Sequence, residues 1–190
     1  MEATQILMDE HRVIERVLTA MEKAIEAINT GRSVKPVFFL ATADFIKGFT
    51  DGCHHAKEEK VLFEAMVQAG VPKAGGPVGM MLLEHEQGRT FVRAMRAGAE
   101  KWQSGDDSGR REVLNAANGY IDLLRAHIYK EDNILFQLAN DAIPLDTQEQ
   151  IAKDFERIER EETGEGVHEK YLALAEELEK ASKQYSLSFD

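Results

Sequence analysis

The sequence predicts an all-α protein: an up-down-up-down bundle of four long helices followed by a C-terminal helical extension. Apolar residues recur at spacings of three and four over long stretches, as on one face of an amphipathic helix. No stretch alternates apolar and polar residues over enough positions to indicate a strand. The prolines, at positions 36, 72, 77 and 144, fall where the helical pattern breaks. Long helices joined by short loops favour antiparallel neighbours.

The first half of the chain predicts two helices. One apolar face continues from the N-terminus to about Gly31, where the first helix should end. A second helix should start near Pro36 and end by about Ala69, ahead of a glycine-rich loop at 70–76. Neither helix contains an internal proline, so each is expected to be continuous.

The second half predicts two further long helices and the extension. A third helix should run from about Pro77 to Ser104, where serine, glycine and aspartate residues cluster as in a turn. A fourth should run from about Arg110 to Asn140. We therefore predict a bundle over residues 1–145 and an extension over 146–190, which carries 6 basic and 13 acidic residues. Two glycines split the extension into two shorter helices, expected to pack on the bundle or cap it.

Composition excludes several classes of protein. A chain of 190 residues suits one domain with its own core. The net charge of −11 disfavours nucleic acid, whose phosphates are bound by Lys and Arg. No apolar run approaches the about 20 residues of a membrane-spanning helix, and the N-terminus lacks a signal-peptide pattern, so we expect a cytoplasmic protein without a membrane partner. The single Cys53 excludes an internal disulfide.

The most informative feature is an internal repeat. The segment 54–63 aligns with 127–136, with histidine on histidine, glutamate on glutamate and Leu-Phe on Leu-Phe. A Glu-His pair at 10–11 aligns in the same way with one at 84–85. Each half of the chain therefore carries a lone histidine and then, on the following helix, His-x-x-x-Glu.

The repeat supplies six candidate metal ligands. Residues four apart on a helix lie on one face, about 5–6 Å apart, so each His-x-x-x-Glu can aim both side chains at one centre. Antiparallel packing brings the histidines of the first and second helices level, and likewise those of the third and fourth. Between the second and third helices the 70–77 loop must absorb a mismatch in length. The candidates are His11, His54, Glu58, His85, His127 and Glu131.

Four imidazoles and two carboxylates inside a bundle predict a pair of divalent cations. Unpaired buried charge is costly, and two cations bridged by both glutamates would compensate it. Imidazole and carboxylate suit iron, zinc, copper and manganese, so the residue types alone do not select one. Ferritin-like bundles instead use Glu-x-x-His, a spacing that occurs here only at 165–168, and that family does not fit.

From about residue 4 to 140 the chain resembles the hemerythrin-like, or HHE cation-binding, family of four-helix bundles with a non-haem di-iron centre. That family's pattern is a lone histidine, His-x-x-x-Glu, a histidine, and a histidine followed by a carboxylate, on successive helices. Oxygen-carrying hemerythrins have a His-x-x-x-His on the third helix, whereas Met81 and Arg89 occupy those spacings around His85. The set of four histidines and two glutamates looks closer to di-iron proteins associated with nitrosative stress and iron-sulfur cluster repair, without their typical N-terminal domain.

The resemblance implies a role for each ligand. One iron would be held by His11 and His54 and the other by His85 and His127. The two glutamates and an oxo or hydroxo ligand would bridge the irons, and zinc or manganese fit the same donors. Each iron would keep one open position. We hypothesise that two open positions favour reduction of O2, H2O2 or NO over reversible oxygen carriage.

Several neighbours of these ligands have plainer interpretations. His55 should point about 100° away from His54 on a helix, which predicts a surface residue or a residue that supports the ligands from behind. Glu59 and Asp132 follow the two bridging glutamates and can accept hydrogen bonds from ligand histidines. Solvated charge is the interpretation we favour for both carboxylates.

Four more residues near the repeat, or in the extension, offer polar groups. Tyr120 and Tyr129 can donate a proton near the site, but packing is the favoured interpretation. Cys53 is expected to be an inert buried thiol. His168 either brings the extension close to the metals or simply starts the last helix, and we favour the second.

Three functions remain open from the sequence. The first is a di-iron protein that binds or reduces O2, NO or H2O2, a diatomic ligand or a peroxide being its partner. The second is an iron or oxygen sensor or binding module without turnover, in which metal loss loosens the bundle. The third is a metal-free structural interaction bundle.

Overall fold

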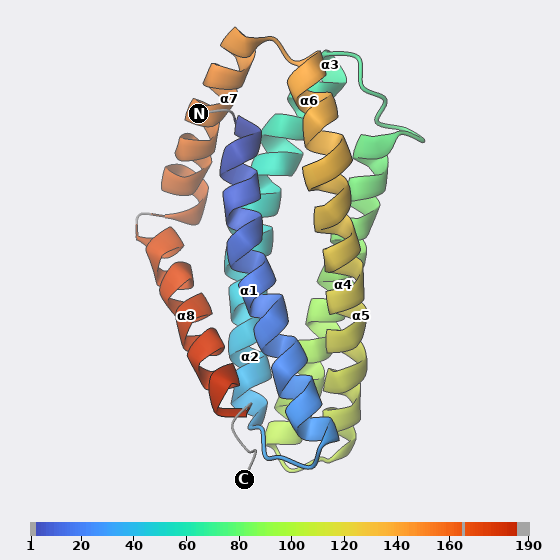
Figure 1. Ribbon diagram of the computed structural model, residues 1–190, viewed down its shortest axis with the longest axis vertical. Coiled ribbons are helices and arrows are strands. Elements are labelled where there is room, and N and C mark those ends of the chain that lie inside the picture. Colours follow the sequence, from blue (N-terminus) through green and yellow to red (C-terminus); the bar gives the residue numbers. More distant parts are fainter. Residues whose placement is uncertain (1–2, 165, 186–190) are drawn as a thin grey trace.

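In a computed structural model the chain forms an antiparallel bundle of four long helical runs, with further helices along one side (Figure 1). The structure describes residues 3–164 and 166–185, and no strand occurs among them. The predicted all-α class and helical bundle are confirmed.

The four runs have the following bounds. The first is α1 (Ala3–Asn29), and the third is α4 (Pro77–Gln103). The second consists of α2 (Pro36–Phe45), two π-helical stretches, η1 (Ile46–His55) and η2 (Glu58–Leu62), and α3 (Phe63–Gln68). The fourth consists of α5 (Ser108–Lys130), the π-helical η3 (Glu131–Leu135) and α6 (Phe136–Ala142). The side helices are α7 (Leu145–Ile158), η4 (Glu159–Thr163) and α8 (Val167–Tyr185).

Proline and glycine set the helix ends that the sequence predicts. Pro36 and Pro77 occupy the first turn of α2 and α4, where the missing N–H costs no intrahelical bond. Gly31 and Gly70, with φ of 81° and 97°, take the left-handed conformation that ends α1 and α3. The chain reverses after each of these glycines, which gives the alternating directions of the bundle.

The second and fourth runs widen into π-helix, which the sequence does not predict. The stretches η2 and η3 begin at Glu58 and Glu131 and match each other within the internal repeat. The longer η1, which contains His54 and His55, has no such match, because the equivalent part of the fourth run is regular α-helix. π-Helical turns are rare and frequently mark functional sites.

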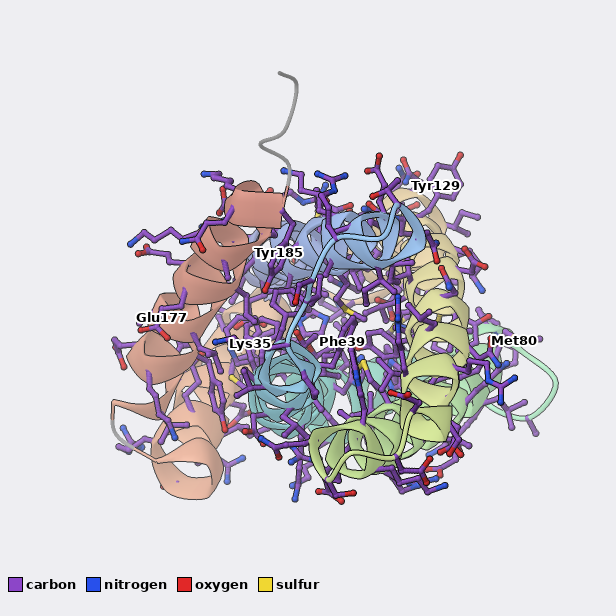
Figure 2. All side chains as sticks on the ribbon, turned by 90° about the horizontal axis from the view of Figure 1, so that it is seen from below. Lys35, Phe39, Met80, Tyr129, Glu177 and Tyr185 are labelled. Atoms are coloured by element: carbon purple, nitrogen blue, oxygen red, sulfur yellow. The ribbon has the colours of Figure 1, made fainter. Side chains whose placement is uncertain are left out.

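The core of the bundle is two apolar clusters with a polar layer between them. Along α1, Leu7 belongs to one cluster and Ile14 to the other, and His11 lies between them. Along α4, Met81 and Met95 likewise belong to different clusters. Seen from below, Phe39 lies among the side chains that fill the bundle (Figure 2).

The C-terminal helices pack along α1 and α2 rather than over an end of the bundle (Figure 1). Phe155 of α7 joins one apolar cluster and Leu178 of α8 joins the other. The ring of Tyr171 lies so close to Gly48 that a Cβ there would be 1.9 Å from it. Arg16 of α1 donates a hydrogen bond to Glu179 at 2.8 Å. Among the residues described, none of the helices is both long and apolar enough to cross a bilayer.

Alanine substitutions at two glycines of α4 should change the free energy of unfolding in opposite directions. A Cβ at Gly98 would lie 2.9 Å from the backbone nitrogen of Val113, so Gly98→Ala must push α5 away and should cost about 1–3 kcal/mol. A Cβ at Gly88 meets only side-chain atoms, at 3.6 Å or more, so Gly88→Ala should gain about 0.5–1 kcal/mol from reduced unfolded-state entropy. Urea unfolding of both variants measures the difference, and equal midpoints would contradict the close α4–α5 crossing.

Candidate metal centre

The structure brings all six candidate ligands together in the polar layer. Each of the four runs of the bundle contributes to the group, and every member is at most 1% exposed. Two overlapping sets of four residues have ligand atoms within 4.8 Å of one another, and both contain Glu58. The role of the six as metal ligands stays a prediction, but the spacing argument that selected them agrees with the geometry.

The two glutamates each reach across the centre to two histidines. Glu131 Oε2 lies 3.2 Å from Nε2 of both His11 and His127. Glu58 Oε1 lies 3.5 Å from His54 Nε2, and its Oε2 lies 3.5 Å from His85 Nε2. Both carboxylates are therefore placed to bridge a His11/His54 position and a His85/His127 position.

The donors at this centre lack partners of their own. Both side-chain oxygens of Glu58 and Glu131, and Nε2 of His11, have no hydrogen-bond partner among the residues described. Buried polar atoms are nearly always satisfied, because leaving them unpaired costs the desolvation penalty in full. Imidazole nitrogens and carboxylate oxygens that converge without partners fit a pair of divalent cations.

The two buried glutamates have pKa values shifted in opposite directions. Burial raises the pKa of Glu58 well above its usual value, and the neighbouring Glu131 raises it further. Burial also opposes ionisation of Glu131, but the nearby imidazoles of His127 and His11, each 3.2 Å from its Oε2, hold its pKa well below the usual range. Cations that bind here must displace protons, as is general for such ligands.

Each ligand histidine donates its Nδ1–H to a carboxylate on the preceding run. The acceptors are Asp132 for His11 at 2.7 Å, Glu10 for His54 at 2.9 Å, Glu59 for His85 at 2.7 Å and Glu84 for His127 at 2.9 Å. This cyclic arrangement places the proton on each Nδ1 and turns each Nε2 toward the centre, where those of His85 and His127 lie 3.1 Å apart. Metal-ligating histidines characteristically have such partners.

A cation stands behind each of these four carboxylates. Lys57 pairs with Glu10 at 2.5 Å and Arg89 with Glu59 at 2.7 Å, while Arg12 pairs with Asp132 and Lys130 with Glu84. Burial alone would raise the pKa of Glu10, but the hydrogen bond from His54 and the charge of Lys57 lower it to about 2. Burial likewise opposes ionisation of Glu59 and Glu84, but hydrogen bonds from His85 and His127 lower the pKa of these two carboxyl groups as well.

The Leu-Phe of the repeat also has a structural role. Phe136 stacks on the ring of His11, with centroids 5.6 Å apart, and Phe63 stacks on His85 at 5.9 Å. Both phenylalanines belong to the apolar cluster on one side of the polar layer. They restrict the rotation of the two lone histidines and exclude water from that side.

The structure corrects the interpretation of His55. It is not a surface residue, because only 4% of it is exposed, and its ring stacks on that of His85 with centroids 3.8 Å apart. Neighbouring side chains on a π-helix are separated by a smaller rotation than the about 100° of an α-helix. His54 and His55 of η1 can therefore both face the interior.

Supporting residues were only partly identified from the sequence. Glu59 and Asp132 accept hydrogen bonds from His85 and His11, so the interpretation that the sequence favoured, solvated charge, is wrong. Glu10 and Glu84 were seen as part of the repeat, but their role was missed. The signal was present: each directly precedes a lone histidine in both halves of the repeat, and each accepts a hydrogen bond from the histidine of the following run.

The remaining residues largely follow their plainer interpretations. Tyr129 is 64% exposed and lies on the outside of the bundle (Figure 2), so it does not reach the centre. Tyr120 and Cys53 are buried in the core. His168 does begin the last helix, α8, and its Nδ1 lies 3.6 Å from Glu159.

A second group of metal-ligating residue types gathers beside α8. Glu10, Cys53, Glu159 and His168 have ligand atoms within 4.8 Å of one another. The ammonium of the fully buried Lys57 lies among them and is paired with both glutamates. This group already contains its cation, which distinguishes it from the centre of the bundle.

A buried centre of this kind in a four-run bundle defines a cation-binding helical protein, and comparison with known families identifies which one. Residues 2–139 match the model of the hemerythrin HHE cation binding domain, and the chain belongs to this family. The resemblance suggested by the spacing of the histidines is confirmed.

The relatives include proteins with and without a described activity. An uncharacterized protein of Mycobacterium tuberculosis is 24% identical over 186 residues, which cover 98% of this chain and 72% of that protein. The iron-sulfur cluster repair protein YtfE of Dickeya chrysanthemi is 28% identical over 134 residues, covering 69% of this chain and 60% of that protein. A probable iron-sulfur cluster repair protein of Haemophilus influenzae is 26% identical over 125 residues, covering 65% of this chain and 55% of that protein. No solved structure matches the chain significantly.

Glu84 provides a test of the carboxylates that accept hydrogen bonds from the four candidate ligand histidines. Glu84→Ala should weaken cation affinity by about 10- to 100-fold, because His127 loses the acceptor that fixes its tautomer. Competition titration with a metal-binding dye measures the change. Glu86→Ala, two residues further along α4 at a site 60% exposed, is the matched control and should leave affinity unchanged. An equal loss in both variants would contradict a specific role for Glu84.

Proposed function

We propose that the chain is a non-haem di-iron protein that binds or reduces a small molecule, O2, NO or H2O2, at a carboxylate-bridged centre. The observation that carries the proposal is the set of buried, unpartnered oxygens on Glu58 and Glu131, each carboxylate lying between two imidazoles. A set of six donors with two bridging carboxylates suits two cations better than one. The third function, a metal-free bundle, leaves these atoms unexplained.

The relatives support iron as the metal. The donor types also suit zinc and manganese, so the choice does not follow from residue chemistry. The YtfE relatives are named for repair of iron-sulfur clusters, which makes iron the natural metal for a chain that is similar to them in sequence. When bound, a pair of ferrous ions supplies an open coordination position and two electrons, as many as reduction of one H2O2 to water consumes.

The protein's own groups prepare this centre for a small ligand. The four carboxylates behind the histidines hold every Nε2 in place, so the donors need little rearrangement when a cation binds. A pocket of about 310 Å³ opens between η1, α4 and α5 and reaches the edge of the centre at His55 and Glu84. Its walls include Ile46, Val92 and Leu124, an apolar lining that suits uncharged diatomic molecules and H2O2.

One observation favours the second function, a sensor without turnover. Lys57 connects Glu10, which supports His54, to Glu159 of the C-terminal helices. Loss of the metal would free His54 and weaken this connection, so that the extension could separate from α1 and α2. The sensor and the reductase share the centre and differ in whether many ligand molecules are consumed.

Iron stoichiometry tests the centre itself. The intact chain loaded with ferrous iron without oxygen should bind two irons, as measured by elemental analysis after desalting. Glu58→Ala and Glu131→Ala should each retain fewer than two, because each removes a carboxylate shared by both positions. Glu64→Ala, an exposed carboxylate paired with Lys73, is the control and should retain two. Full iron content in both site variants would contradict the assigned bridges.

Mixing experiments distinguish reduction from sensing. The diferrous protein should react with O2, NO or H2O2, and with added reductant it should consume many equivalents of at least one of them. Stopped-flow absorbance and gas or peroxide electrodes measure the reaction. A stable, reversible complex that is never consumed would contradict reduction. Ligand-dependent changes in helix content or association without consumption would indicate the sensor.

A further inference from the structure

The pocket beside the candidate centre is larger than a small inorganic ligand requires. Its volume is about 310 Å³, and one water molecule takes up about 30 Å³ of the liquid. Each of O2, NO and H2O2 has only two heavy atoms, so any of them would fill a fraction of this space. Sites for organic ligands have volumes of about 300–1,000 Å³. The pocket therefore has room for an organic molecule.

The inner walls of the pocket are apolar. Ile46 of η1 and both Tyr120 and Leu124 of α5 line it, and each is at most 4% exposed. On α4 the wall includes Gly88, where an added Cβ would lie 3.6 Å from the Tyr120 ring, so a larger side chain would take up room beside that ring. An apolar ligand that enters leaves water for these walls, which favours binding.

The mouth of the pocket carries a positive charge without a partner. Lys47 of η1 lines the pocket, is exposed, and forms no ion pair within the part of the chain that the structure describes. Asp44 and Asp51 lie three residues before it and four after it, where a carboxylate can reach a lysine on one helix face. Arg96 and Arg89 of α4, respectively, pair with these two carboxylates instead. The ammonium of Lys47 is thus left for a ligand.

The charge around the pocket contrasts with that of the whole chain. The charged residues that line it are four basic and two acidic, a surplus of two positive charges. The whole chain has a net charge of −11. A ligand of single negative charge is therefore favoured at this mouth over the rest of the acidic surface.

We propose that this pocket is a binding site for an organic monoanion, whose apolar body lies against Tyr120 and Leu124 and whose charged group pairs with Lys47. The proposal goes beyond the di-iron function, because neither the apolar walls nor Lys47 belongs to the candidate metal ligands. It gives the ligand two separate sources of affinity, burial of the body and an ion pair at the mouth. A bound anion also covers His55 and Glu84, where the pocket reaches the edge of the centre.

Calorimetric titration of the intact, iron-loaded chain with three probes tests both sources of affinity. The probe 1-octanesulfonate has the apolar body and the single charge, 1-octanol has only the body, and methanesulfonate has only the charge. A sulfonate is chosen because it is a weak ligand for iron. One equivalent of 1-octanesulfonate should bind, about 3- to 10-fold more tightly than 1-octanol. Methanesulfonate should give no measurable binding, since it buries almost no apolar surface.

Two lysine variants distinguish the pocket from general attraction between charges. Lys47→Ala should weaken binding of 1-octanesulfonate about 3- to 10-fold and leave binding of 1-octanol unchanged, because only the ion pair is lost. Lys35→Ala is the matched control: it removes the same charge from an exposed lysine directly before α2, outside the pocket lining, and should change neither affinity.

A third variant tests the location of the site. Val92→Trp adds bulk to the pocket wall and should abolish saturable binding of 1-octanesulfonate. Equal affinities for 1-octanesulfonate and 1-octanol, equal losses in the two lysine variants, or unchanged binding in Val92→Trp would overturn the proposal. If Val92→Trp does not fold, the three probes and the lysine pair decide the matter. Fewer than two irons in the intact chain, with 1-octanesulfonate still bound, would instead overturn the di-iron centre and leave the anion site standing.

Discussion

The structure depends on the burial of two glutamates that have no partners of their own. Glu58 and Glu131 lie in the middle of a helical bundle, between two apolar clusters, where an uncompensated carboxylate is costly. Successive layers surround them: imidazoles first, then four carboxylates, then Arg and Lys side chains, of which Lys57 is buried beneath the C-terminal helices. Each run supplies a histidine and a cation that together hold a carboxylate of the preceding run. The polar layer therefore fixes the register of all four runs at once.

Much of this arrangement could be predicted because the chain contains the same pattern twice. A single His-x-x-x-Glu on an acidic helix has little meaning, but a matched pair with matched lone histidines restricts the geometry to one shared centre. Helix ends were predicted to within a few residues, since Pro36, Pro77, Gly31 and Gly70 have conformational requirements that depend little on tertiary context. The same holds for the buried apolar faces.

What the sequence did not predict depends on features that no local pattern encodes. π-Helical winding follows from competition between i→i+4 and i→i+5 bonding inside a packed bundle, so the orientation of His55 could not be obtained from a regular helix. The roles of Glu10 and Glu84 depend on which helices are neighbours in space. Lys57 would ordinarily be assigned to a solvated face, but the C-terminal helices cover it completely.

Two differences between the halves of the repeat concern access to the centre. Lys57 and Lys130 are equivalent in the repeat, yet the extension buries the first and leaves the second 34% exposed. The extension therefore closes the side of α1 and α2, while the pocket opens on the side of α4 and α5. His55 lines that pocket and the two bridging glutamates do not. A solute that enters there meets His55, a histidine whose equivalent in the repeat is Ile128, so the two halves of the repeat differ at η1 both in backbone winding and in what faces the pocket.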